Sequence, residues 1–371
     1  MNARTKTSRW LGVAVISAGL GLVSGMAAGA TGSGSRDVLD QPARFSERAK
    51  SSVLTAIAAA GQRLVAVGER SVVLLSDDHG RNWRQAKAVP SSVALTGVRF
   101  ASESTGWAVG HSGIVLKTTD GGETWARQLE GRQAATIEQA AADAAADGSP
   151  ASTRRQRDAQ GLVADGADKP FLDAYFFDTQ RGFVVGAYGL AFATRDGGKT
   201  WVSLVGQIDN PRSRHLYQVA AAGNALLITG EQGNLLRSTD GGQHFAALPL
   251  SYPGTLFGAV VARDEAIVVF GLRGNAFRST DQGASWKKVD FGLPLTLTAG
   301  ITLRDGRLAV VDETGRLLLS RDSGATFASL AVPKMNSATG LVQAADGALV
   351  IATQRGAVRV APEALNPEQK K

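Results

Sequence analysis

"KTTDGGETW", residues 117–125, is the stretch that decides the fold, because close copies of it recur along the chain. Each copy places an aspartate two residues before a glycine and an aromatic ring three residues after that glycine. The other copies are "LSDDHGRNW" at 75–83, "ATRDGGKTW" at 193–201, "RSTDGGQHF" at 237–245, "RSTDQGASW" at 278–286 and "LSRDSGATF" at 319–327. An internal repeat of this kind indicates a protein built from many similar structural units.

A second motif, two short apolar runs around a tight turn, precedes each copy. It occurs seven times, at 65–76, 107–118, 183–194, 227–238, 268–279, 309–320 and 350–360. Successive turns are 41 to 44 residues apart, except for one step of 76 residues. A period of about 40–45 residues with four short strands is typical of a β-propeller blade. The sequence therefore predicts an all-β chain with a seven-bladed β-propeller over 51–360.

The turns and the chain ends carry further expectations. Glycines at these turns are expected to supply the positive φ that a two-residue hairpin needs. The last repeat stops after its third strand, so the N-terminal segment 31–50, around 36–45, is expected to supply the outer strand and close the ring. Residues 361–371 are expected to form a flexible tail.

The repeated acids are predicted to be structural. A short carboxylate in a turn accepts hydrogen bonds from backbone N–H groups of its own turn, and the ring that follows packs into the sheet. The residues concerned are Asp78, Asp120, Asp196, Asp240, Asp281 and Asp322, with Trp83, Trp125, Trp201 and Trp286. The alternative is that each acid binds calcium or a glycan, but motifs spread around a ring cannot converge on one ligand.

One insertion of about a repeat's length, residues 131–169, separates the second and third blades. Its alanine-rich part, 134–147, predicts a helix that ends at Gly148 before Pro150. A cluster of arginines follows this helix, with Arg154 and Arg155 adjacent to each other.

A partner-binding face is expected where the turns meet this insertion. In a propeller, the turns between strands two and three share a face with the connections between blades. The residues proposed for that face are Arg70, His111, Tyr188, Arg273 and Arg355 from the turns, with Arg154 and Arg155 from the insertion. Arginine and tyrosine are favoured at protein interfaces. The alternative is an ordinary solvated rim.

The start of the chain predicts export, and the composition argues against several classes of function. Residues 1–30 read as a secretory signal peptide with cleavage after Ala30, and an uncleaved membrane anchor is the alternative. The absence of cysteine excludes disulfides and thiolate catalysis. A net charge of +7 without a basic cluster interleaved with aromatics gives no support to nucleic-acid binding. The scattered histidines His79, His215 and His244 predict no metal site, and no cofactor is expected.

The S/T-x-D-x-G-x-T/S-W pattern is the Asp-box or BNR repeat. With "FASESTGWAVGHSGIVLKTTDGGETW" at 100–125, the chain resembles the photosystem II stability and assembly factor family over roughly 50–360. The resemblance implies an exported, non-catalytic propeller that binds a membrane-protein subunit during assembly. The segment 168–189 is similar to bacterial relatives whose hosts do not photosynthesise, and the alanine-rich insertion departs from the plant and cyanobacterial pattern. The expected location is therefore the periplasm, or the thylakoid lumen of a photosynthetic host.

An enzyme remains the alternative, because Asp-box propellers also include sialidases and other glycoside hydrolases. Such enzymes need paired carboxyl groups, or a tyrosine nucleophile with an arginine cluster. The inner strands are rich in small apolar residues, and only Asp173, Arg181 and Glu231 form an acid–base set worth testing. The prediction is a monomeric, non-catalytic protein whose partner is a membrane-complex subunit or an envelope protein, with no small-molecule substrate.

Overall fold

The computed structural model describes residues 37–332, 335 and 337–365. The signal peptide expected at 1–30 lies outside these residues. The described chain forms seven antiparallel sheets, numbered here in chain order. No helix in this part of the chain is long and apolar enough to cross a membrane.

Six sheets have four strands and the seventh has three. Sheet 1 consists of β1 (Leu54–Ala60), β2 (Arg63–Gly68), β3 (Val73–Ser76) and β4 (Arg84–Gln85). Sheet 2 consists of β5 (Leu95–Phe100), β6 (Gly106–Gly110), β7 (Val115–Thr118) and β8 (Ala126–Leu129). Sheet 3 consists of β9 (Phe171–Phe176), β10 (Gly182–Gly186), β11 (Ala191–Thr194) and β12 (Val202–Ser203). Sheets 4 and 5 consist of β13 (Leu216–Ala222), β14 (Ala225–Gly230), β15 (Leu235–Ser238) and β16 (Ala246–Ala247); and β17 (Leu256–Val261), β18 (Ile267–Gly271), β19 (Ala276–Ser279) and β20 (Lys287–Val289). Sheets 6 and 7 consist of β21 (Leu297–Thr302), β22 (Leu308–Asp312), β23 (Leu317–Ser320) and β24 (Ala328–Leu330); and β25 (Ala338–Gln343), β26 (Leu349–Thr353) and β27 (Gly356–Val360).

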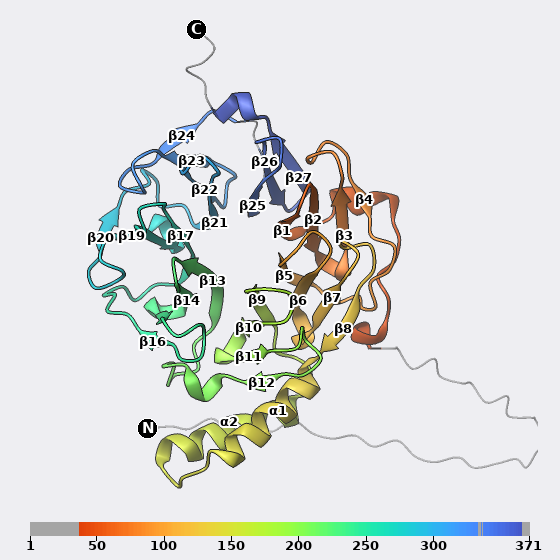
Figure 1. Ribbon diagram of the computed structural model, residues 1–371, viewed down its shortest axis with the longest axis vertical. Helices are drawn as coiled ribbons and strands as arrows, with labels where there is room; N and C mark the ends of the chain where they lie inside the picture. The colour runs from red at the N-terminus through yellow and green to blue at the C-terminus, as the bar shows by residue number, and fades with distance from the viewer. Residues whose placement is uncertain (1–36, 333–334, 336, 366–371) are drawn as a thin grey trace, which may run out of the picture. The chain divides into compact units, whose positions relative to one another are not determined.

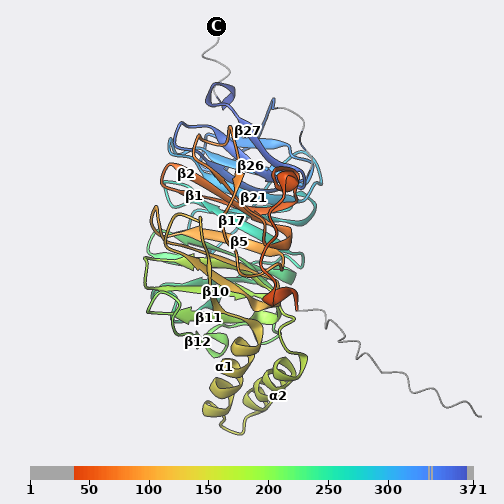
Figure 2. The same cartoon turned by 90° about the vertical axis from the view of Figure 1, so that its right-hand side faces the viewer.

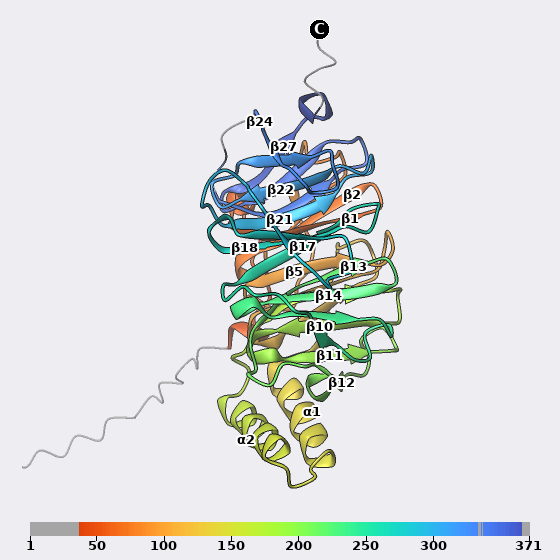
Figure 3. The same ribbon diagram turned by 90° about the vertical axis from the view of Figure 1, so that its left-hand side faces the viewer.

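The sheets are arranged in a ring, with the first strand of each sheet innermost (Figure 1). Each first strand contacts the first strand of the next sheet, from β1 through β5, β9, β13, β17 and β21 to β25, and β25 contacts β1. The side views show the sheets edge-on, with the helical insertion extending beyond β12 (Figures 2 and 3). The seven repeats of the sequence therefore correspond to the seven sheets.

Apolar second strands hold neighbouring sheets together. Every residue of β6, β10, β18, β22 and β26 is buried. These strands consist mainly of aliphatic, aromatic and small residues, because both of their faces pack against a neighbouring sheet. The outer strands are short and largely exposed, so most of the core lies between the inner halves of the sheets.

The leading and the later glycines of these turns have different roles. Gly110 (φ −177°) and Gly186 (φ −166°) are extended, which any residue adopts. Glycine is required there because a Cβ would lie 2.3 Å from the carbonyl oxygen of Ala94 or Pro170, respectively. The positive φ values occur later in each turn, as at Gly113 (φ 63°). The expectation that glycines at these turns supply positive φ is therefore confirmed, but for the later glycine of a turn and not for the leading one.

Replacing Gly110 by alanine is expected to lower the free energy of unfolding by about 1–3 kcal/mol, because the new methyl group must displace the backbone at Ala94. Gly161 is the matched control, since it lies in a helix with nothing within 4 Å of its Cβ position. Gly161→Ala is expected to stabilise by up to about 1 kcal/mol through helix propensity. Urea unfolding of both variants checks the two signs, and equal effects would contradict the steric explanation.

The described part of the N-terminal segment, residues 37–50, does not close the ring as a strand. Among residues 37–50, the described part of that segment, there is no strand, and η2 (Glu47–Ser51) is a 3-10 helix capped by Ser46. The helix contacts β27 and β4, so it lies at the junction of sheets 7 and 1 without joining either sheet. The expected closing strand is wrong because the capping serine and the acid in the first turn favour a helical turn here.

Side chains close the ring instead. Thr339 Oγ1 of sheet 7 donates to the carbonyl oxygen of Leu54 at 2.8 Å. Arg81 of sheet 1 and Asp346 of sheet 7 form an ion pair at 3.1 Å. An apolar cluster that includes Leu64 and Val350 fills the space between these two sheets.

The insertion between sheets 2 and 3 contains two helices, not one. α1 (Gly131–Ala144) covers most of the predicted helix, and α2 (Pro150–Asp165) contains the arginine cluster. Pro150 begins α2 rather than ending a helix, with Ser149 as the N-cap. The C-terminal prediction also changes, because Pro362–Leu365 is a 3-10 helix whose Leu365 is buried.

Candidate functional site

Each repeated acid is hydrogen-bonded within its own turn, between the third and fourth strands. Asp120 shows the pattern: Oδ1 accepts the N–H of Thr124 at 2.9 Å and the hydroxyl of Thr118 at 2.8 Å. The same hydroxyl accepts the N–H of Gly122 at 2.9 Å. The corresponding acceptors are Asp78, Asp196, Asp240, Asp281 and Asp322. These contacts lie inside each turn, which fits the structural role predicted for the acids.

Three of these acids are expected to make stability dependent on acid pH. The N–H of Asn82 lowers the pKa of Asp78 to about 2, and the hydroxyls of Thr200 and Ser285 do the same for Asp196 and Asp281. Because each pKa falls below the ordinary 3.8, the stabilisation is complete above about pH 4 and is lost as the pH falls towards about 2.

Thermal melts between pH 5 and pH 2 check this expectation. Asp281→Asn retains a side-chain oxygen as an acceptor but removes the titrating proton, so its melting temperature should fall less steeply over this interval. A slope equal to that of the original protein would contradict the assignment.

The turns between the second and third strands lie on the face that carries the connections between sheets. The N–H of His111 donates to Ala94, which precedes β5, and the N–H of Ala187 donates to Pro170, which precedes β9. The five residues proposed for this face are all exposed: Arg70, His111, Tyr188, Arg273 and Arg355.

Three of these five residues occupy left-handed backbone positions. Arg70 (φ 53°), Tyr188 (φ 56°) and Arg273 (φ 55°) are the middle residues of their 3-10 turns, η3 (Glu69–Ser71), η5 (Ala187–Gly189) and η8 (Leu272–Gly274). Residues with a Cβ rarely adopt this conformation without a local cost. His111 opens its turn, and Ser112 (φ 58°) takes the left-handed position there.

The structure brings Tyr188 and the insertion arginines together. A groove of about 350 Å³ separates α2 from η5 and the loop 205–213, and Arg154, Arg155 and Tyr188 line it. The ammonium group of Lys169 lies 5.0 Å from the centre of the Tyr188 ring. Arg70, Arg273 and Arg355 belong to the turns of sheets 1, 5 and 7 and do not line this groove.

Arg155 has a structural partner inside the insertion. Its Nε and Nη2 atoms donate to the two carboxylate oxygens of Glu138 in α1, at 2.8 and 3.1 Å. The hydroxyl of Ser203 in β12 donates to the same carboxylate. Glu138 is only 2% exposed, so this network joins both helices to sheet 3. Arg154, in contrast, is exposed and lies 3.6 Å from Asp158 of its own helix.

The acid–base set considered for catalysis is not assembled. Asp173 pairs with Arg99 at 3.1 Å in the centre of the ring, whereas Arg181 pairs with Asp178 at 2.8 Å in the turn after β9. Glu231 belongs to a turn of sheet 4, where it accepts the N–H of His215 at 3.0 Å. Among the described residues, no group of three or more His, Cys, Asp and Glu side chains is placed to hold a metal ion.

The central cavity contains a polar cluster, of which Asp173 was found from the sequence but its partner Arg99 was not. The cavity has a volume of about 180 Å³ and is lined by the first strands of all seven sheets. Asp173 is 7% exposed and raises the pKa of Arg99 through its charge. An alignment of the repeats could have pointed to this cavity, because five of the seven first strands carry Gly or Ala at the position of Asp173.

A sequence model of the family described as "Photosynthesis system II assembly factor YCF48" matches residues 156–361, more than half of the chain. The chain belongs to the YCF48 family. The match begins in α2 and runs through sheets 3 to 7, so sheets 1 and 2 and α1 lie outside it. The resemblance inferred from the sequence motifs is therefore confirmed.

Solved structures of YCF48 share the fold. A structure described as YCF48 bound to D1 peptide has 16% sequence identity and a TM-score of 0.59, with 84% of this chain and 93% of that chain covered. YCF48 from Cyanidioschyzon merolae has 15% identity and a TM-score of 0.59 over 87% and 99% of the two chains.

Structures outside the YCF48 family share the fold as well. The structure of streptogramin B lyase has 13% identity and a TM-score of 0.63 over 86% and 96% of the two chains. The WD40 β-propeller domain of Doa1 has 11% identity and a TM-score of 0.60 over 86% and 95%. The comparison with curated proteins found no match. Fold likeness at this level of identity therefore extends to an enzyme and does not by itself decide the activity.

Proposed function

We propose that this YCF48-family protein is an exported, non-catalytic, seven-bladed propeller that binds a polypeptide segment of a membrane-complex subunit and assists the assembly or stability of that complex. The family membership carries the proposal, together with the solved YCF48 that holds a D1 peptide. Residues 1–30 have the composition of a signal peptide, which supports export to the periplasm, or to the thylakoid lumen of a photosynthetic host.

The turn face is the proposed binding surface. Arg70, Tyr188 and Arg273 are exposed at the middle of their turns, and arginine and tyrosine are favoured at protein interfaces. Arg355 adds a further positive charge on the same face. Arginines spread over several sheets suit an extended partner segment that carries acidic residues.

A crosslinking pull-down from the host's own membranes tests this proposal. The tagged full-length protein is expected to capture a membrane-complex subunit or its precursor. The triple variant Arg70→Glu, Arg273→Glu, Arg355→Glu should lose that partner, because it reverses three charges on the proposed surface.

The matched control reverses three exposed charges at the opposite ends of the third strands, with Arg195→Glu, Lys199→Glu and Arg321→Glu. This control should retain the partner at the original yield. Equal loss in both triple variants would attribute binding to net charge and overturn the proposed surface. Recovery of glycans or cell-wall fragments in place of a protein subunit would favour a glycoside hydrolase or a glycan-binding envelope protein.

A further inference from the structure

The first strands that line the central cavity are nearly uniform, and two of them differ from the rest. At the third position of these strands, five sheets carry a small residue: Ala56, Gly97, Gly258, Ala299 and Gly340. The neighbouring strands β9 and β13 carry Asp173 and Gln218 instead. Polar groups placed where neighbouring repeats need only small residues carry a desolvation cost, which a ligand contact would offset.

Arg99 directs part of its guanidinium group into the cavity. Its Nε and Nη2 atoms donate to the two oxygens of Asp173, at 3.4 and 3.1 Å. The N–H of Val219 donates to the second of these oxygens at 2.9 Å, so both carboxylate oxygens are engaged. The Nη1 atom of Arg99 has no hydrogen-bond partner among the described residues, and 41% of the side chain is exposed.

Gln218 supplies a second free donor in the lining of the same cavity. Its Oε1 atom accepts the N–H of Ala259 at 2.7 Å, which fixes the amide and makes Nε2 the group left over. No residue in the described part of the chain accepts a hydrogen bond from Nε2. The cavity therefore presents two donors without a partner, Arg99 Nη1 and Gln218 Nε2. Both oxygens of the Asp173 carboxylate already accept hydrogen bonds from Arg99 and Val219.

Two aromatic side chains also line the cavity. Tyr217 and Phe257, each one position before the third residue of its strand, are 5.2 Å apart in an edge-to-face arrangement. Four other strands carry a threonine at this position: Thr55, Thr96, Thr298 and Thr339. An apolar surface and two hydrogen-bond donors in one cavity fit a ligand with both an apolar and an anionic part.

We propose that the central cavity binds a carboxylate group attached to an aromatic or aliphatic group. Arg99 Nη1 and Gln218 Nε2 donate to the carboxylate oxygens, and Tyr217 and Phe257 contact the apolar part. Asp173 holds the guanidinium group in position. This site uses none of the residues proposed for the turn face, so the two proposals stand or fall independently. The carboxylate has two sources, a free small molecule or an acidic side chain of a polypeptide.

Fluorine NMR with 4-fluorophenylacetate as the probe tests the site in the full-length protein. The probe should bind saturably, whereas the neutral 4-fluorophenylacetamide should not. A capped tetrapeptide with phenylalanine next to glutamate should displace the probe if polypeptides reach the cavity, and its glutamine counterpart should not. Displacement by the glutamate peptide identifies an acidic side chain as a source, and its absence with intact probe binding identifies a free carboxylate.

Two variants weaken the site with little change to the fold. Gln218→Glu retains the oxygen that accepts from Ala259 but replaces the free donor by a negative oxygen. Arg99→Lys retains a positive charge beside Asp173 but removes the second arm of the guanidinium group. Each variant should weaken probe binding about tenfold or more, because one charge-assisted hydrogen bond is lost.

Arg70→Glu is the control, because it changes the turn face and leaves the cavity intact. It should bind the probe as the original protein does. Absence of saturable probe binding to the original protein, or equal weakening by Arg70→Glu and Gln218→Glu, would overturn the proposal. Circular dichroism of each variant shows whether the fold is retained. If Arg99→Lys fails to fold, the result for Gln218→Glu decides.

Discussion

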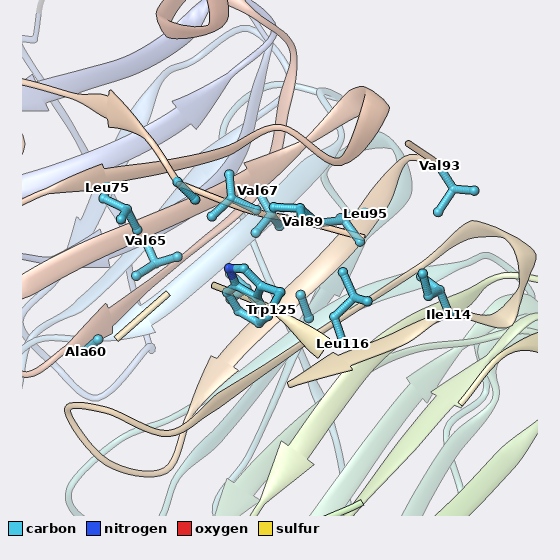
Figure 4. Packing of buried hydrophobic residues seen from close by; sticks show 14 of the residues in the cluster. Ala60, Val65, Val67, Leu75, Val89, Val93, Leu95, Ile114, Leu116 and Trp125 are labelled. Atoms are coloured by element: carbon cyan, nitrogen blue, oxygen red, sulfur yellow. The ribbon is translucent and has the colours of Figure 1, made fainter. Parts of the chain in front are cut away.

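Replacing Trp125 by alanine is expected to lower the free energy of unfolding by about 3–5 kcal/mol. The ring is 6% exposed and packs between sheets 1 and 2, near Val65, Leu75 and Leu116 (Figure 4). Its Nε1 atom also donates to the carbonyl oxygen of Gly122 at 2.9 Å. The substitution removes a large apolar surface and leaves a cavity, and both effects destabilise. Urea unfolding followed by circular dichroism measures the loss.

Two further variants separate the contributions at this position. Trp125→Phe loses the Nε1 donor and part of the ring system but keeps most of the apolar volume, so it should cost less than Trp125→Ala. Trp286→Ala should also cost less, because Trp286 is only half-buried in the corresponding turn. An unchanged unfolding curve for Trp125→Ala would contradict the structural role of the repeated motif.

Replacing Glu138 by alanine is expected to destabilise the attachment of α1 and α2 to sheet 3 by about 3–5 kcal/mol. The substitution leaves the guanidinium group of Arg155 without its bidentate partner, and the hydroxyl of Ser203 loses its acceptor. An uncompensated charge in this half-buried place is costly. Amide hydrogen exchange should show faster exchange across 131–165, while β17 to β22 remain protected.

Asp158→Ala is the matched control for the loss of an acid from the insertion. Its pair with Arg154 has half of each side chain exposed, and pairs of this kind contribute about 0–1 kcal/mol. Exchange in α1 and α2 should therefore change little in this variant. If Glu138→Ala left the exchange of α2 unaltered, the buried network would not be what holds the insertion.

The repeats could be predicted from the sequence because each sheet is encoded locally. The alternation of apolar runs, turns and acid–glycine–aromatic motifs repeats along the chain, so the strands and the place of the insertion follow from it. The end of α1 and the start of α2 were also encoded locally, since serine followed by proline at 149–150 is a typical helix start. Reading Pro150 only as a helix breaker missed the second helix.

Contacts between distant segments could not be predicted in the same way. Arg99 and Asp173 are 74 residues apart, and they meet only because the insertion leaves sheets 2 and 3 adjacent in the ring. The pairing of Arg155 with Glu138 likewise depends on how two helices pack. The backbone strain at Arg70, Tyr188 and Arg273 follows from turn geometry that an arginine or a tyrosine does not signal.

The junction between sheets 7 and 1 has a consequence for how the chain can be cut and rejoined. No strand is shared there among the described residues, and Gly356 N lies 3.0 Å from the carbonyl oxygen of Ser52. The two ends of the ring are thus neighbours, and their junction is built from the same kinds of side-chain contact as the others. A circular permutant that links these ends and opens between sheets 4 and 5 would keep every strand in its own sheet. The ring is therefore expected to form whichever of the seven sheets is synthesised first.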